Sequence, residues 1–171
     1  MVQLITGGAR SGKSRYAQEL ALTLSGQPVY VATAQVWDDD FADRIRRHKG
    51  ERGPAWTNYE EEMYLSRLPL EGRVVVIDCV TLWLTNFFMQ FQYDVNQALQ
   101  AIRDEIGALT QKEGTFIFVT NEIGMGVHAE TEAGRKFTDL QGWTNQHLAR
   151  IADTVVLMVS GIPVVIKKEA Q

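Results

Sequence analysis

One octapeptide near the N-terminus, GGARSGKS at residues 7–14, restricts the fold of this chain more than any other stretch. It matches the pattern G-x-x-x-x-G-K-[ST], and it lies between the apolar residues LIT and the helical sequence RYAQELALTL. Such glycines let successive backbone N–H groups at a helix N-terminus face a phosphate chain. The pattern predicts a phosphate-binding loop (P-loop) between a first strand and a first helix. The alternative is a glycine-rich turn without a ligand.

A P-loop assigns roles to its residues. Lys13 is expected to reach the β- and γ-phosphates of a nucleoside triphosphate, and Ser14 is expected to hold Mg²⁺. The predicted nucleotide-binding loop comprises Gly7, Gly8, Ala9, Arg10, Ser11, Gly12, Lys13 and Ser14.

A second carboxylate on the magnesium side is expected from a strand beside the first one. The sequence RVVVIDC supplies it, because four apolar residues predict a buried strand and Asp78 follows at its carboxyl end, where open α/β sheets bind ligands. Asp78 would also serve as the N-cap of the next helix. Ser14 and Asp78 are therefore the predicted metal ligands.

Short β-branched segments alternate with longer helical segments along the chain. Apolar runs without strict alternation predict strands buried on both faces, and they fall at residues 2–6, 29–33, 74–78, 115–120 and 154–159. Helices are predicted at residues 13–24, 39–49, 80–91, 95–111 and 130–153, and an edge strand at 164–167 after Pro163. The pattern predicts one P-loop NTPase-like domain over residues 1–171: a mostly parallel sheet with helices on both faces, in three α/β/α layers.

The composition of the chain excludes several kinds of partner and site. The formal net charge of −4 argues against a broadly basic nucleic-acid binder. The single cysteine, Cys79, excludes an internal disulfide and a cysteine-based metal cluster. No uncharged stretch is long enough to span a bilayer, and the N-terminus does not resemble a signal peptide, so a cytoplasmic protein is expected.

One histidine lies within a cationic stretch. His48 is surrounded by Arg44, Arg46, Arg47, Lys49 and Arg52. Neighbouring positive charge lowers an imidazole pKa, so His48 would stay neutral and nucleophilic near pH 7 while the cations hold a phosphate chain. Attack of an imidazole nitrogen on an α-phosphorus would give a phosphoramidate and release pyrophosphate. The alternative is a solvated helix face in which His48 has no catalytic role.

Other P-loop classes fit less well. Switch GTPases select guanine with a sequence that resembles N-K-x-D after a late strand. Residues 120–126, at the corresponding place, read TNEIGMG and lack the lysine and aspartate. An ATPase motor needs partner domains that 171 residues do not supply. A small-molecule phosphotransferase fits the chain length better.

Several motifs in order along the chain carry a more specific resemblance. They are GGARSGKSRYA, YVATAQ followed by DDDFADRIRRHK, W-T-x-x-E at residues 56–60, DCVTLWLTN at 78–86, TNEIGMG at 120–126 and G-x-x-NQ at 142–146. Together they resemble the bifunctional adenosylcobinamide kinase / adenosylcobinamide-phosphate guanylyltransferase family of cobalamin biosynthesis. The resemblance extends from residue 6 to about residue 167.

That resemblance implies two reactions. A nucleoside triphosphate, ATP or GTP, would phosphorylate the aminopropanol hydroxyl of adenosylcobinamide. GTP would then guanylylate a histidine that corresponds to His48, and the GMP would pass to adenosylcobinamide phosphate, giving adenosylcobinamide-GDP. A P-loop kinase of another small alcohol, with His48 incidental, remains the alternative, and a non-catalytic nucleotide-binding module remains a third interpretation.

The resemblance also implies further site residues and partners. His48, Lys13 and Asp78 would be catalytic, and Thr33, Ala34, Lys49, Arg52 and Glu60 would join the P-loop in binding nucleotide. Mg²⁺ is the expected cofactor, and adenosylcobinamide, adenosylcobinamide phosphate, ATP and GTP are the expected ligands. Neither nucleic acid nor a membrane span is expected, and a homo-oligomer, for instance a trimer, is implied.

Two further segments leave alternatives open. An apolar face recurs at helical spacing in residues 80–91, formed by Val80, Trp83, Leu84, Phe87, Phe88 and Phe91. This face predicts core packing, and the alternatives are a subunit interface or a wall for the corrin ring. Residues 127–146 depart from the usual family pattern, so no role is assigned to His128, Arg135 or Asp139, and His147 is expected to be an ordinary helix residue.

Overall fold

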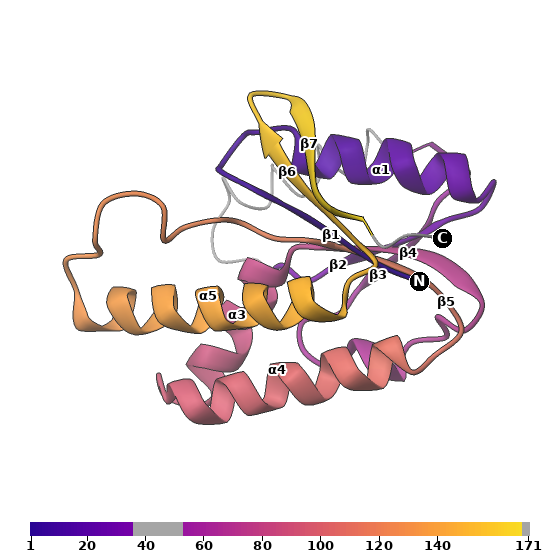
Figure 1. The fold of residues 1–171 in the computed structure, drawn as a ribbon. Helices are drawn as coiled ribbons and strands as arrows, with labels where there is room; N and C mark the ends of the chain where they lie inside the picture. Colours follow the sequence, from indigo (N-terminus) through magenta and orange to yellow (C-terminus); the bar gives the residue numbers. More distant parts are fainter. Residues whose placement is uncertain (36–52, 169–171) are drawn as a thin grey trace.

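The computed structural model of the chain describes residues 1–35 and 53–168 and is built on a seven-stranded sheet (Figure 1). The strands are β1 (Val2–Gly7), β2 (Val29–Ala32), β3 (Thr57–Glu60), β4 (Arg73–Asp78), β5 (Gly114–Val119), β6 (Thr154–Val159) and β7 (Ile162–Lys168). Their order in the sheet is β3-β2-β4-β5-β1-β6-β7. All neighbouring pairs are parallel except β6 and β7.

Helices cover both faces of the sheet. Figure 1 shows α1 (Lys13–Leu24) on one face and α3 (Val80–Gln90), α4 (Val95–Thr110) and α5 (Glu132–Ile151) on the other. A short 3₁₀ turn, η1 (Leu65–Arg67), contacts α4. The predicted three-layer α/β/α class is confirmed. None of the helices among the described residues has the length and hydropathy of a bilayer span.

The sheet separates two apolar clusters. On the α1 side, Ala17 and Ala21 pack with strand residues such as Ile5 and Ile117. On the other side, α3, α4 and α5 bury a larger set, which includes Leu4, Phe116, Trp83, Phe87, Ile102 and Leu140. All six residues of β1 are buried, as expected for a central strand covered on both faces. Packing on both faces therefore holds in place the strand that leads into the P-loop.

The apolar face of α3 lies in the core of its own chain. Trp83 and Leu84 are fully buried, and Phe87 stacks on Phe91 with centroids 6.4 Å apart. The core-packing interpretation is confirmed. The alternative of a subunit interface or corrin wall is wrong for this face, because its side chains are already covered by α4, α5 and the sheet.

Two expectations about the sheet were wrong. The strand β3 was not predicted, and it pairs with β2 at the edge of the sheet. The Asp78 strand, β4, was expected beside β1, but β5 lies between them. The other strands and helices lie within a few residues of their predicted bounds, and the edge strand β7 is confirmed. The helix predicted at 39–49 lies outside the described residues.

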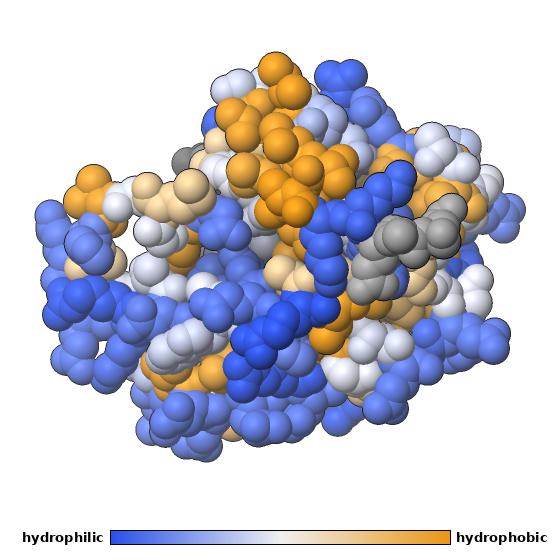
Figure 2. Space-filling model, in the orientation of Figure 1, coloured by the Kyte–Doolittle hydropathy of each residue, from blue (hydrophilic) through white to orange (hydrophobic). Residues whose placement is uncertain are grey.

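The β6–β7 hairpin presents apolar side chains to solvent. Figure 2 shows them as a patch over these two strands, and its exposed members are Val159, Ile162, Val164, Val165 and Ile166. Main-chain groups of the same hairpin reach the P-loop, since Gly161 N donates to Ser11 O at 3.0 Å.

Candidate nucleotide site

The P-loop runs from the end of β1 to the start of α1, as predicted. Gly7 has φ 146°, and a Cβ at this position would lie 2.5 Å from Met158 O. Gly12 is the N-cap of α1, with φ 93°. Only glycine accepts both conformations without strain. The loop is thus shaped by its glycines and by the neighbouring strand β6.

Lys13 is the buried cation of the loop. It is 7% exposed, and its Nζ donates to Gly8 O at 2.6 Å. Burial lowers the pKa of this ammonium, while the Asp78 carboxylate raises it. The carboxylate of the predicted metal ligand therefore acts on the predicted phosphate-binding lysine in the direction that favours its charged form.

Asp78 has a specific hydrogen-bond donor. Tyr30 Oη donates to Asp78 Oδ2 at 2.8 Å, and the Tyr30 ring packs edge-on against Trp56. The hydroxyl of Ser14 and the carboxylate of Asp78 are hard oxygen donors, the type that Mg²⁺ prefers together with phosphate oxygens and water. The residues present thus fit Mg²⁺.

The carboxyl ends of β2, β3 and β4 lie side by side. Ala32 is in register with both Glu60 and Asp78, so the expected residues 33, 34 and 60 gather at the same edge as Asp78. Thr33 itself is fully buried, and its hydroxyl accepts from Cys79 N and donates to Cys79 O. Its side chain therefore holds the chain just after β4, and its predicted place in the nucleotide site stays a prediction.

A carboxylate that the sequence did not single out lies beside the loop. Glu122 Oε1 accepts hydrogen bonds from Thr6 Oγ1 at 2.8 Å and Asn145 Nδ2 at 2.9 Å, and Glu122 N donates to Gly7 O. Asn145 also accepts from Thr120 and Gln141, so α5, β5 and β1 join in one polar network. Glu122 lies at the base of the P-loop.

A cavity of about 370 Å³ opens next to this network. Its lining includes Gly8, Ser11 and Glu122, together with Met125 from the loop after β5 and the end of β6. The loop after β5 therefore forms one wall of the space beside the P-loop.

A family model described as cobinamide kinase / cobinamide phosphate guanyltransferase matches residues 3–166. The chain belongs to this family. The match covers both the P-loop strand and the last strand of the sheet, so it concerns the whole fold and not one motif.

Named relatives agree with the family. The bifunctional adenosylcobalamin biosynthesis protein CobU of Escherichia coli K12 is 40% identical, over 98% of this chain and 100% of the relative. The bifunctional adenosylcobalamin biosynthesis protein CobP of Pseudomonas aeruginosa PAO1 is 38% identical, over 99% of each.

Two solved structures are more distant. The flagellar accessory protein FlaH of Methanocaldococcus jannaschii has 13% identity and a TM-score of 0.47, covering 98% of this chain and 78% of that one. The second structure, an ATPase domain, has 10% identity and a TM-score of 0.48, covering 98% of this chain and 76% of that one. At these values neither likeness bears on function.

Part of the predicted site lies outside the described residues of this family member, namely His48, Lys49 and Arg52. The described part brings the P-loop, Lys13 and Asp78 together at one edge of the sheet. Sequence reasoning missed Tyr30 and Glu122. Glu122 had a usable signal, because it lies just beyond the carboxyl end of the buried strand β5, as Asp78 lies at the carboxyl end of β4. The contact of Tyr30, in contrast, depends on the pairing of β2 with β4.

Proposed function

We propose that this protein carries out both activities in its family's name: phosphorylation of cobinamide, in its adenosyl form, and guanylyl transfer to the resulting phosphate. The observation that carries the proposal is the P-loop itself, with Lys13 buried and its Nζ hydrogen-bonded to Gly8 O, in a chain matched by the family over residues 3–166.

In the kinase step, the P-loop N–H groups and Lys13 hold the triphosphate of ATP or GTP. Ser14 and Asp78 would hold Mg²⁺, which would neutralise charge on the phosphates. The aminopropanol hydroxyl of the substrate attacks the γ-phosphorus, the bond from the γ-phosphorus to the β–γ bridging oxygen breaks, and the nucleoside diphosphate leaves. We assign orientation of the attacking hydroxyl, and acceptance of its proton, to Glu122, the carboxylate that lines the cavity beside the loop.

In the transferase step, a ring nitrogen of His48 attacks the α-phosphorus of GTP and pyrophosphate leaves. A phosphate oxygen of adenosylcobinamide phosphate then attacks the same phosphorus, the P–N bond breaks and His48 is regenerated. Lys49, Arg52 and Glu60 are proposed to bind the nucleotide around His48. A single nucleophile thereby divides the exchange into two displacements, each of which needs charge neutralisation and in-line geometry.

GTP labelled at the α-phosphorus tests the transferase. With Mg²⁺, the wild type is expected to acquire one GMP, stable to alkali and labile to acid, on the peptide that carries His48. His48→Ala is expected to acquire none, and adenosylcobinamide phosphate is expected to discharge the wild-type adduct. A nucleotide-binding wild type that forms no adduct would favour a plain P-loop kinase.

Replacement of Glu122 tests its assigned role. Glu122→Gln keeps the shape but removes the proton acceptor, so kcat of the kinase step is expected to fall about 100-fold or more. The matched control is Glu130→Gln, an exposed position on the same loop. An unchanged kcat in Glu122→Gln would assign the proton to another group.

A further inference from the structure

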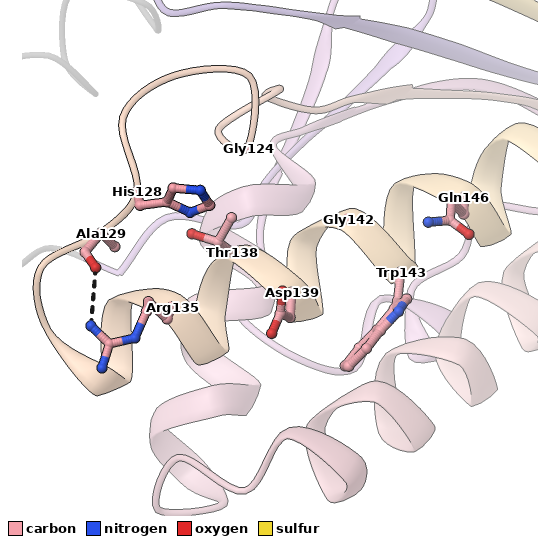
Figure 3. Close-up of a pocket in the computed structure, with 9 residues that line it drawn as sticks. All are labelled: Gly124, His128, Ala129, Arg135, Thr138, Asp139, Gly142, Trp143 and Gln146. Carbon is pink, nitrogen blue, oxygen red and sulfur yellow. Dashed lines mark hydrogen bonds between the residues drawn. The ribbon is translucent and has the colours of Figure 1, made fainter.

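A second cavity lies on the far side of the loop after β5. It has a volume of about 410 Å³ and lies between residues 124–129 and residues 135–146 of α5 (Figure 3). Figure 3 shows His128 and Ala129 on the loop and Arg135, Thr138 and Asp139 on α5, with Thr138 pointing toward His128. We call this space the α5 cavity.

The side chains of the α5 cavity hold its loop wall in place. Arg135 Nη1 donates to Glu130 O at 2.7 Å and to Ala129 O at 3.2 Å. A guanidinium has five N–H donors, so Arg135 retains donors for another group. Thr138 Oγ1 donates to Gly134 O at 2.9 Å, which leaves its oxygen able to accept a hydrogen bond.

The charges of the lining indicate the kind of group that fits. Asp139 would repel a phosphate or carboxylate, and Arg135 would repel a cation. An uncharged primary amide suits both residues, because its carbonyl accepts from Arg135 and its NH₂ donates to Asp139 or Thr138. The cavity therefore favours a neutral group that is donor and acceptor at once.

The two cavities share a wall. Glu122 and Met125 line the cavity beside the P-loop, whereas Gly124 and His128, on the same loop, line the α5 cavity. A ligand whose hydroxyl reaches the P-loop can thus extend a second arm across this loop. The tip of the loop is apolar and exposed, since Met125 is 78% exposed and Val127 is 97% exposed.

We propose that the α5 cavity binds an amide-bearing side arm of cobinamide while the aminopropanol arm of the same molecule reaches the P-loop. This inference rests on the proposed function. Cobinamide carries uncharged amide arms around a flat macrocycle that is too large for this cavity, so only one arm enters. The macrocycle then lies over Met125 and Val127, where burial of exposed apolar surface contributes affinity.

A glycine of α5 offers a test with little risk to the fold. Gly142 lines the α5 cavity, and a Cβ added there meets no atom within 4 Å. Gly142→Leu is therefore expected to fill part of the cavity. The substitution should not weaken the helix, because leucine is favoured over glycine in a helix by up to about 1 kcal/mol. We expect the Kd for cobinamide, followed by its visible absorbance in equilibrium dialysis, to rise about tenfold or more, a loss equal to one or two hydrogen bonds.

The matched control is Gly107→Leu. Gly107 lies within α4, outside both cavities, and a Cβ there also meets no atom within 4 Å. This variant is expected to bind cobinamide as the wild type does. Thermal unfolding of both variants should give Tm values no lower than that of the wild type, which separates a blocked cavity from a damaged fold.

A second variant removes a hydrogen-bonding group and does not fill the cavity. Asp139→Ala deletes the acceptor and is expected to raise the Kd for cobinamide about threefold to tenfold. Wild-type Kd in both Gly142→Leu and Asp139→Ala would overturn the α5 cavity assignment. Activity of the wild-type enzyme decides the proposed function separately: an enzyme that turns over cobinamide while both variants bind it normally retains the function and loses only this inference.

Discussion

Asp78 is positioned by a donor on a neighbouring strand, the phenol of Tyr30. Tyr30→Phe removes that donor, and a partner that orients a metal ligand typically contributes about 10- to 100-fold to metal affinity. We therefore expect the Mg²⁺ concentration for half-maximal kinase activity to rise about tenfold, with most of kcat restored at saturating Mg²⁺. Tyr93→Phe, at an exposed tyrosine, is the control. An unchanged Mg²⁺ requirement in Tyr30→Phe would separate Asp78 from metal binding.

The thiol of Cys79 gives the fold a dependence on alkaline pH. Burial is the main cause that raises the pKa of this thiol to about 12, well above that of an unfolded cysteine. As pH rises, the unfolded state ionises first, so the contribution of the thiol to stability is complete below about pH 8.5 and is lost between there and pH 12.

Urea unfolding at successive pH values measures this effect. The free energy of unfolding is expected to fall with a slope of up to about 1.4 kcal/mol per pH unit from Cys79 alone. Cys79→Ala should lack that component, although its overall stability will be lower. Equal slopes in the two proteins would show that folding does not raise the pKa of Cys79.

Single residues also show what a local sequence pattern can indicate and what it cannot. Lys13 and Asp78 were predicted because each stands at a fixed place after a buried strand. The family resemblance assigned Thr33 to the nucleotide site, and the structure adds that its hydroxyl bonds to the main chain of Cys79. The direction of that side chain depends on the path of residues 78–79, a tertiary contact that no local pattern encodes.

At the scale of elements, α5 ties the sheet to the P-loop through Asn145. Its amide donates to Asn121 O and Glu122 Oε1 and accepts from Thr120. Asn145→Asp removes these donors and places a second carboxylate against Glu122, so a loss of about 2–4 kcal/mol in unfolding free energy is expected.

Denaturant titration checks this value against Asn96→Asp. Asn96 is exposed in the first turn of α4, where a carboxylate is favourable, so its replacement should change stability by no more than about 0.5 kcal/mol. Similar effects of the two substitutions would mean that the network contributes little to stability.

Burial pattern explains which elements the sequence predicts. The central strands and α3 were predicted because continuous apolar runs and a helical apolar face mark them. The strand β3, with sequence TNYE, is four residues long and half exposed, so it lacks both signals. Its place in the sheet comes from pairing with β2, and the insertion of β5 between β4 and β1 likewise follows from topology and not from any segment's composition.

At the scale of the whole molecule, we propose that copies associate and that the apolar β6–β7 edge is their contact. An exposed apolar edge strand is a template for pairing with another chain, and charges on the strand oppose it. The double variant Ile162→Lys, Ile166→Lys is therefore expected to lower the molar mass in light scattering relative to the wild type. A change at two exposed residues of α1, Leu22→Lys with Leu24→Lys, is the control. Equal masses for the wild type and the β7 variant would place any contact elsewhere.

The hydrogen bond from Gly161 to Ser11 joins that edge to the P-loop. If association shifts the hairpin, it also shifts the P-loop, and subunit association and nucleotide binding become thermodynamically linked. Linkage is reciprocal. If association of subunits raises the affinity for nucleotide by some factor, bound nucleotide raises the affinity between subunits by the same factor. Nucleotide supply would then regulate not only how fast the protein works but also how many subunits work together.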